Sequence, residues 1–228
     1  MYEIQLFGRL EVRTRGVRLT GRDFGGVKPR HILALLALRG PLRSGELTEL
    51  LWDGRPPADH EDMVRSYAAV LRHRLDPSAG VRDSVIATSN GGYALVAERV
   101  RVDVARFDEL VSVASGRTAS RALPPLTAAV HLAGRPLLAE ERSAWADAAR
   151  DRYRVRLIET LLEAAEHALA VGRSREALDL AERAGGLEPL AEHGWQIAMT
   201  AHRALGDRRA DRPTTLSLLP RLAAGLLA

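Results

Sequence analysis

The chain of 228 residues is long enough for one large or two small domains, and 46% hydrophobic with 27% charged residues is the composition of a globular protein. The absence of cysteine excludes disulfide scaffolds, thiolate zinc sites and cysteine nucleophiles. The formal net charge of +4 lies entirely in residues 1–101, which hold 16 Arg or Lys and 12 Asp or Glu, so the N-terminal half is the part suited to a polyanionic partner.

The chain has neither a membrane segment nor a targeting signal by its sequence pattern. No apolar run approaches the roughly 20 residues of a membrane span. The first residues alternate in polarity and include Glu3 and Arg9, unlike a signal peptide. We therefore expect a cytoplasmic protein without a membrane partner.

Residues 2–27 are predicted to form short strands, because Tyr2, Ile4 and Leu6 alternate with polar residues. The period becomes helical at Lys28, with Pro29 well placed at a first helical position and Gly40 as the stop. The helix is apolar nearly all round, which predicts the central core helix of its domain.

A second helix is expected from Ser44, the predicted N-cap, with Glu46 in the first turn and Trp52 at its end. A stiff loop with two prolines follows. Asp59 is the predicted cap of a third helix, which Pro77 ends.

The third helix has two chemically different faces. The spacing i, i+3, i+4, i+7 and i+11 predicts a buried apolar stripe of Val64, Tyr67, Ala68, Leu71 and Leu75. The opposite face carries Arg65, Ser66, Ala69, Arg72 and His73. Residues 63–75 hold three arginines and no carboxylate, which suits a helix in a DNA major groove. The alternative for such a helix taken alone is a solvated basic face.

Two strands, Val85–Thr88 and Tyr93–Val96, are predicted next, joined by a turn with the Asn-Gly pair that strongly favours a hairpin. Two helices, a basic helix and a hairpin, preceded by a small sheet, describe a winged helix-turn-helix of the OmpR-like subclass. In this arrangement the third helix enters the groove. The hairpin is the wing, placed to touch an adjacent minor groove or the DNA backbone.

The chain after Arg101 is predicted to be helical throughout. The predicted helices are Val104–Ser115, Pro125–Leu132, Glu140–Val171, Ser174–Ala184 and Ala191–Leu205. Gly172 and Gly206 follow similar segments 34 residues apart, which is the tetratricopeptide period. The residues Ala177, Leu180, Ala181 and Ala184 are expected to form the packed face of one repeat helix. A helix-pair solenoid offers a concave protein-binding or self-association surface, and the alternative is a plain helical bundle.

No catalytic, metal-binding or cofactor-binding residues are predicted. The chain contains no GxGxxG, GxxxxGK[ST], GxSxG or HExxH motif, and its seven histidines are scattered. His73 is expected to face a groove or a phosphate. The tryptophans Trp52, Trp145 and Trp195 are expected to be packing anchors. We therefore predict a non-enzymatic protein that needs no cofactor.

The segments GVKPRHILALLAL, LTELLWDGRPP, VLRHRLDP, NGGYAL and VRVDVARFDELV, in this order, resemble the streptomycete antibiotic regulatory protein (SARP) family. The second half, including LEPLAEHGWQIAMTAHRALGD, resembles the bacterial transcriptional activator domain of that family. The resemblance implies a mainly α fold with a small N-terminal β component. It divides the chain into an OmpR-like winged helix (1–101), an all-α tetratricopeptide-like activator domain (102–209) and an atypical tail (210–228).

The resemblance also implies a function and its site residues. A family member binds double-stranded DNA at direct repeats as a head-to-tail homodimer and recruits RNA polymerase. The DNA-binding positions carried over are Lys28, Arg30, Arg65, Ser66, Ala69, Arg72, His73, Thr88, Ser89, Asn90 and Tyr93. Lys28 and Arg30 are expected to anchor phosphates, and Arg65 and Arg72 to read bases. The loop with Asp53, Gly54, Arg55 and Asp59 is expected to face the polymerase sigma factor or alpha subunit.

The end of the chain departs from the family pattern. A third repeat normally follows the Gly-Asp pair, whereas Pro213 and Pro220 interrupt any helix here and a leucine cluster replaces the repeat. The difference has two alternative explanations, a shifted or truncated end and a short partner-binding tail. The alternative function is a protein-interaction module whose winged helix contacts protein instead of DNA. The acid-free face of the third helix favours DNA.

Overall fold

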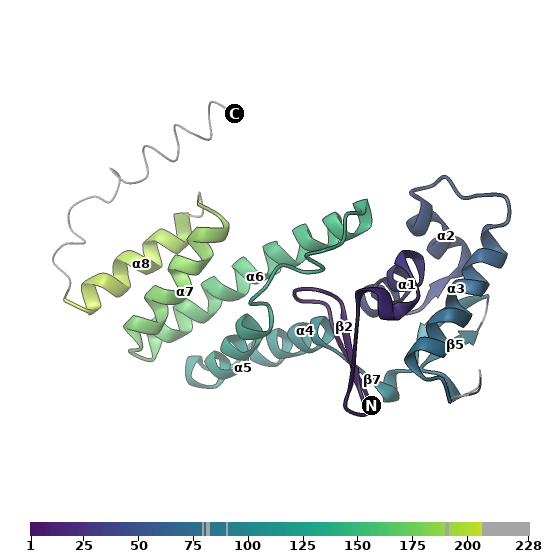
Figure 1. Cartoon of the computed structure of the whole chain (residues 1–228). Helices are drawn as coiled ribbons and strands as arrows, with labels where there is room; N and C mark the ends of the chain where they lie inside the picture. Colours follow the sequence, from purple (N-terminus) through teal and green to yellow (C-terminus); the bar gives the residue numbers. More distant parts are fainter. Residues whose placement is uncertain (79, 81–82, 90, 190–191, 207–228) are drawn as a thin grey trace. The chain divides into compact units, whose positions relative to one another are not determined.

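The computed structural model describes residues 1–78, 80, 83–89, 91–189 and 192–206 (Figure 1). The chain divides into two compact units, the first made of Met1–Ser112 with Ala129–Arg154 and the second of Val113–Ala128 with Val155–Ala228. The predicted class, mainly α with a small N-terminal β component, is confirmed. The predicted tail, 210–228, lies outside the described residues.

The N-terminal sheet has four short strands in the order β3-β2-β1-β7. The strands are β1 (Tyr2–Gln5), β2 (Glu11–Thr14), β3 (Val17–Thr20) and β7 (Val100–Val102). The first three are antiparallel neighbours, and β7 pairs with β1 in parallel. The strands before the first helix agree with the sequence prediction. The sequence did not predict β7, because three residues are too short to show an alternating pattern.

The three helices of the first unit begin and end close to their predicted limits. They are α1 (Val27–Arg39), α2 (Ser44–Trp52) and α3 (His60–Leu75), and a short 3₁₀ turn, η1 (Gly21–Phe24), precedes α1. Helix α1 is the predicted core helix, since all six residues from His31 to Leu36 are buried. It ends at Gly40, which has φ 79° and donates its N–H to the carbonyl of Leu36 at 3.0 Å.

A second sheet of order β4-β6-β5 follows the predicted hairpin. Its strands are β4 (Leu42–Arg43), β5 (Ile86–Ser89) and β6 (Gly92–Leu95), so β5 begins one residue later than predicted and β6 one residue earlier. Tyr93 pairs with Thr88 on one side and with Leu42 on the other. The strand pair and the three helices confirm the winged helix-turn-helix.

Helices beyond residue 101 also belong to the first unit. A 3₁₀ turn, η3 (Ala97–Arg99), leads through β7 to α4 (Asp103–Ala114), α5 (Ala119–Leu132) and α6 (Ala144–Ala170), and the division into units falls within these three helices. The ring of Phe7 packs edge-on against Phe107 at 5.8 Å and against Tyr153 at 5.7 Å. The compact unit with the winged helix therefore extends past the predicted boundary at residue 101.

The second unit is helical in its described residues. Helix α7 (Ser174–Leu187) lies beside α8 (Glu192–Ala204), as Figure 1 shows. All four residues of the predicted repeat face on α7 are buried. Gly172 and Gly206 end α6 and α8 with φ of 77° and 73°, a left-handed backbone that favours glycine. The 34-residue spacing thus places the same turn after two helices.

Two predictions about this part of the chain were wrong. Trp195 is 36% exposed, and its indole N–H donates to the carbonyl of Pro189 at 3.3 Å instead of entering a core. Helix α5 begins at Ala119, before Pro124 and Pro125, because the carbonyl of Thr118 accepts the first helical N–H groups. The expectation that Pro125 would open the helix relied on the preference of proline for the first turn.

Candidate nucleic-acid interface

Helix α3 presents one buried face and one exposed face, as its sequence predicts. The buried residues are Val64, Ala68, Leu71 and Leu75, and Tyr67 is half-buried. Of the five residues predicted for the opposite face, Arg65, Ser66, Ala69 and His73 are exposed. Among the helix residues from Met63 onward, all of which the structure describes, this face carries no carboxylate.

Arg65 is free to contact a partner. Its side chain is 69% exposed and forms an ion pair with Asp62, one turn earlier, at 3.3 Å. An exposed pair of this kind contributes at most about 1 kcal/mol to stability, so a phosphate or a base can replace the carboxylate at little cost.

Arg72 has a different environment from the predicted one. Its Nε donates to the carbonyl of Ile86 at 3.0 Å, its Nη2 donates to Oγ1 of Thr88 at 2.5 Å, and its guanidinium lies 5.8 Å from the ring centroid of Tyr93. Burial lowers the pKa of Arg72, but a guanidinium stays charged in proteins. Arg72 thus joins α3 to the wing, and its donors face the hairpin instead of standing free to read a base.

The predicted wing residues divide in the same way. Thr88 is exposed and accepts the bond from Arg72, whereas Tyr93 is 7% exposed and lies on β6, the strand between β4 and β5. Ser89 pairs with Gly92 in the hairpin. Asn90 lies outside the described residues.

Both predicted phosphate anchors are held by partners within the first unit. Nζ of Lys28 donates to the carbonyl of Leu51 and lies 5.2 Å from the ring of Trp52, so it caps the end of α2. Nε of Arg30 lies 2.5 Å from Oε1 of Glu141. The geometry therefore favours an ion pair of Arg30 with Glu141 over the expected role as a free phosphate anchor.

Glu141 is the residue that sequence reasoning missed. Its carboxylate is 5% exposed and accepts a hydrogen bond from Arg30, and Nε2 of His31 lies 2.8 Å away. Burial by itself raises the pKa of a carboxyl, but the hydrogen bonds and charges of His31 and Arg30 outweigh it and lower the pKa of Glu141. The partners lie 110 and 111 positions apart, so no local pattern could have indicated the pair.

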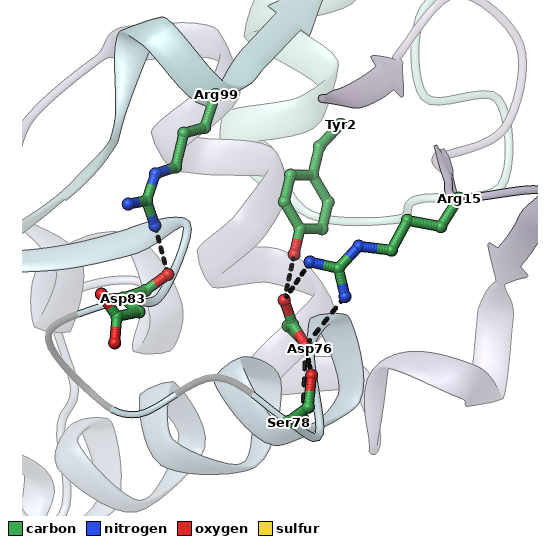
Figure 2. A network of polar contacts seen from close by, with 6 residues as sticks. All are labelled: Tyr2, Arg15, Asp76, Ser78, Asp83 and Arg99. Atoms are coloured by element: carbon green, nitrogen blue, oxygen red, sulfur yellow. Dashed lines mark hydrogen bonds and ion pairs between the residues drawn. The ribbon is translucent and has the colours of Figure 1, made fainter.

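The C-terminal end of α3 is fastened to the N-terminal sheet by the network in Figure 2. Asp76, directly after the helix, accepts hydrogen bonds from the hydroxyls of Ser78 at 2.8 Å and Tyr2 at 3.1 Å, and forms an ion pair with Arg15 at 3.2 Å. The Ser78 bond, then those of Tyr2 and Arg15, lower the pKa of Asp76 although burial opposes the shift. The network holds the C-terminal end of α3 against the N-terminal sheet.

The loop between α2 and α3 is presented to solvent. Asp53, Gly54, Arg55 and Asp59 are all exposed. Asp53 and Gly54 have φ of 50° and 76°, and the N–H groups of Gly54 and Arg55 bond back to α2 at 3.0 Å. The turn is thus tied to α2 through its backbone, which leaves the Arg55 side chain available for a partner.

No group of three or more His, Asp or Glu side chains within the described residues is arranged to hold a metal ion. None of their helices is both long and apolar enough to span a bilayer.

Three comparisons with known proteins bear on this arrangement. The sequence profile described as "Bacterial transcriptional activator domain" matches residues 102–211. The regulatory protein AfsR of Streptomyces coelicolor is 35% identical over 150 residues, which cover 61% of this chain and 14% of AfsR. The chain therefore spans only a small part of the length of that relative.

A solved structure has the same fold. Mycobacterium tuberculosis EmbR, in a complex with a low-affinity phosphopeptide, superposes with a TM-score of 0.75 and 24% identity, over 92% of this chain and 56% of EmbR. The winged helix precedes the residues that match the activator-domain profile. Residues 102–211 therefore match a bacterial transcriptional activator domain, and the chain is similar in sequence to a streptomycete regulatory protein.

Proposed function

We propose that this chain is a sequence-specific activator that inserts α3 into the major groove of double-stranded DNA. The observation that carries the proposal is the exposed, acid-free face of α3, with Arg65, Ser66, Ala69 and His73. A B-DNA major groove about 12 Å wide accepts such a helix, and an arginine there reads guanine while short side chains let the helix approach the bases. Arg65 is the base-reading residue that the geometry favours.

The wing supports α3 in this proposal and contacts the adjacent backbone. Thr88 lies on the exposed side of β5, and Arg72 holds the hairpin against α3 through the bonds to Ile86 and Thr88. Because Arg72 positions the wing, its contribution to DNA binding is through the spacing between helix and hairpin.

Activation in this proposal requires a second copy and the polymerase. Two chains bind a direct-repeat promoter site head to tail, and the exposed loop with Asp53, Gly54, Arg55 and Asp59 contacts the sigma factor or the alpha subunit. The regulated genes are those of a biosynthetic cluster, and the protein acts on the chromosome in the cytoplasm. The support is the match of residues 102–211 to the activator-domain profile, the similarity to AfsR and the exposure of the loop.

A salt titration of duplex DNA binding tests the proposal. We expect the logarithm of the association constant to fall linearly with the logarithm of salt concentration, with a slope of about −0.9 for each phosphate that is neutralised. An Arg74→Ala variant removes another exposed cation of α3 and should reduce the slope by about 1. A flat dependence on salt would contradict DNA binding and favour a winged helix that contacts protein.

A further inference from the structure

The first unit contains a pocket that the DNA-binding proposal does not use. The pocket has a volume of about 460 Å³ and is formed by β1, β2, β7, the first turns of α4 and the residues around the end of α5. This volume lies within the range of about 300–1,000 Å³ that is typical of small-molecule sites. Helix α3 contributes no residue to it.

The pocket wall is rich in arginine. Arg13 and Arg101 lie directly opposite Glu3 on the two neighbouring strands, so the three side chains form a row on one face of the sheet. Arg106 from α4 and Arg135 from the segment after α5 complete the set. Four guanidinium groups therefore face two carboxylates, Glu3 and Asp103, in the lining.

Asp103 is occupied by the backbone and does not neutralise these cations by direct pairing. Its carboxylate accepts the N–H groups of Leu6 at 2.9 Å, Phe7 at 2.8 Å and Val104 at 2.8 Å. These bonds join the residues that follow β1 to the start of α4.

Two of the four arginines, Arg101 and Arg135, keep their donors available, whereas the other two form ion pairs. Arg13 is paired with Glu11 at 2.7 Å, and Arg106 with Glu109 at 2.6 Å in an exposed pair. Across the described part of the chain, no carboxylate lies within ion-pairing distance of Arg101 or Arg135. Two guanidinium groups without a direct ion pair in a concavity favour an anionic group, which each can bind in a bidentate manner.

Arg135 is held in place by the backbone beneath it. The N–H of Gly8 donates to the carbonyl of Pro136 at 2.9 Å, and the N–H of Ala139 donates to the carbonyl of Gly8 at 2.7 Å. A Cβ at Gly8 would lie 3.2 Å from Cδ of Arg135, so the arginine stem crosses directly over the glycine. The backbone at the base of Arg135 is thus fixed by this chain crossing, and its exposed side chain passes over Gly8.

We propose that this pocket binds a small organic anion. The phosphate or carboxylate group of the ligand pairs with Arg101 and Arg135, and its apolar body lies against Phe7 and Leu132. Leu132 is 37% exposed, an apolar surface that a ligand would cover. The proposal does not depend on DNA binding, because none of these residues lies on α3 or the wing.

The test uses the fluorescent aromatic sulfonate 8-anilinonaphthalene-1-sulfonate with the full chain. We expect saturable binding at one site, at least tenfold weaker in the Arg101→Ala/Arg135→Ala double variant and changed less than twofold in Arg22→Ala, an exposed arginine outside the pocket. A Leu132→Glu variant, which changes an exposed position only, should weaken binding to a similar degree. Circular dichroism confirms that each variant is folded, and the Leu132 variant decides the result if the double variant is not.

Displacement identifies the anionic group and separates the alternatives. Release of the probe by adenosine monophosphate supports a phosphate ligand, and release by decanoate supports a carboxylate. Equal affinity in the wild type and in the folded pocket variants overturns the proposal, as does failure of both displacers. Stoichiometric release of the probe by a short DNA duplex also overturns it, since the arginines would then belong to the DNA surface.

Discussion

Arg65 and Arg72 stand seven positions apart on α3 and show how one residue type takes two roles. Arg65 has one exposed ion pair, with Asp62, whereas Arg72 donates to Ile86 and Thr88 of the hairpin. The helical period places both on the face opposite the apolar stripe, but only the fold brings β5 against Arg72. The chemical role of an arginine therefore depends on what lies within about 3 Å of its guanidinium.

Replacement of Arg65 by Ala should weaken binding to the cognate site by about 1–3 kcal/mol and relax specificity at one base pair, because a bidentate guanine contact is lost. The free energy of unfolding should change by less than about 0.5 kcal/mol, since the pair with Asp62 is exposed. Binding to a set of single-base operator variants, with urea unfolding alongside, measures both. If every sequence weakens equally, Arg65 is a phosphate anchor. Arg72→Ala is the matched comparison and should lower stability as well as affinity.

Replacement of Glu141 by Gln should lower the free energy of unfolding at neutral pH by about 2 kcal/mol, the usual contribution of a hydrogen bond to a charged group, because Arg30 loses its anionic partner. The pKa of Glu141 is lower in the folded protein than its unfolded value of about 4.3. The ion pair therefore stabilises the protein above that pH and ceases to do so as the pH falls through the folded pKa.

Urea unfolding of the wild type and of Glu141→Gln at about pH 7 and about pH 3 measures this dependence. The difference between the two proteins should be full at neutral pH and shrink in acid. Glu140→Gln, at the exposed neighbouring carboxylate, is the control and should change stability by less than about 0.5 kcal/mol. A difference that is the same at both pH values would mean that the charge of Glu141 does not stabilise the fold.

At the scale of the elements, the wing depends on close packing between β4 and β6. Gly92 begins β6 and pairs with Arg43, and a Cβ at Gly92 would lie 2.9 Å from Cα of Arg43 and still closer to the carbonyl oxygen of Leu42. Both neighbours are backbone atoms that cannot rotate away. The close approach, and not the backbone conformation, is what requires a glycine here, because the φ of Gly92 is not in the left-handed region.

Gly92→Ala should accordingly destabilise the protein by about 1–3 kcal/mol, the usual cost of forcing extra atoms into a packed region. Gly45→Ala is the matched control: Gly45 lies in α2 with open space around it, so alanine should be neutral or stabilise by up to about 1 kcal/mol. Thermal unfolding of the two variants checks the contrast. Equal melting temperatures for both variants would show that β4 and β6 can move apart at no cost.

At the scale of the whole molecule, the surface of α3 and the surface of the α2–α3 loop belong to one compact unit but have different proposed partners. Both surfaces project from helices whose apolar sides are buried in the same core. A substitution in the loop can therefore separate recruitment of the polymerase from binding of DNA.

Arg55→Ala should leave operator affinity unchanged within about twofold and reduce activated transcription in a purified system. The reason is that the Arg55 side chain is exposed while its backbone N–H, which bonds to Trp52, is retained in the variant. Footprinting and run-off transcription with RNA polymerase measure the two effects. Arg39→Ala, an exposed arginine at the end of α1, is the control. Undiminished transcription would exclude Arg55 from the polymerase contact.

The sequence by itself determined the helices, the hairpin, the buried stripe of α3 and the resemblance to the activator domain, because each depends on local periodicity, turn residues or motif order. Only the tertiary structure decided that Arg30 pairs with Glu141, that Arg72 joins the wing and that Arg101 and Arg135 share a pocket. These pairings join residues 14 to 111 positions apart. Their geometry follows from how the elements pack, and local spacing along the chain carries no information about it.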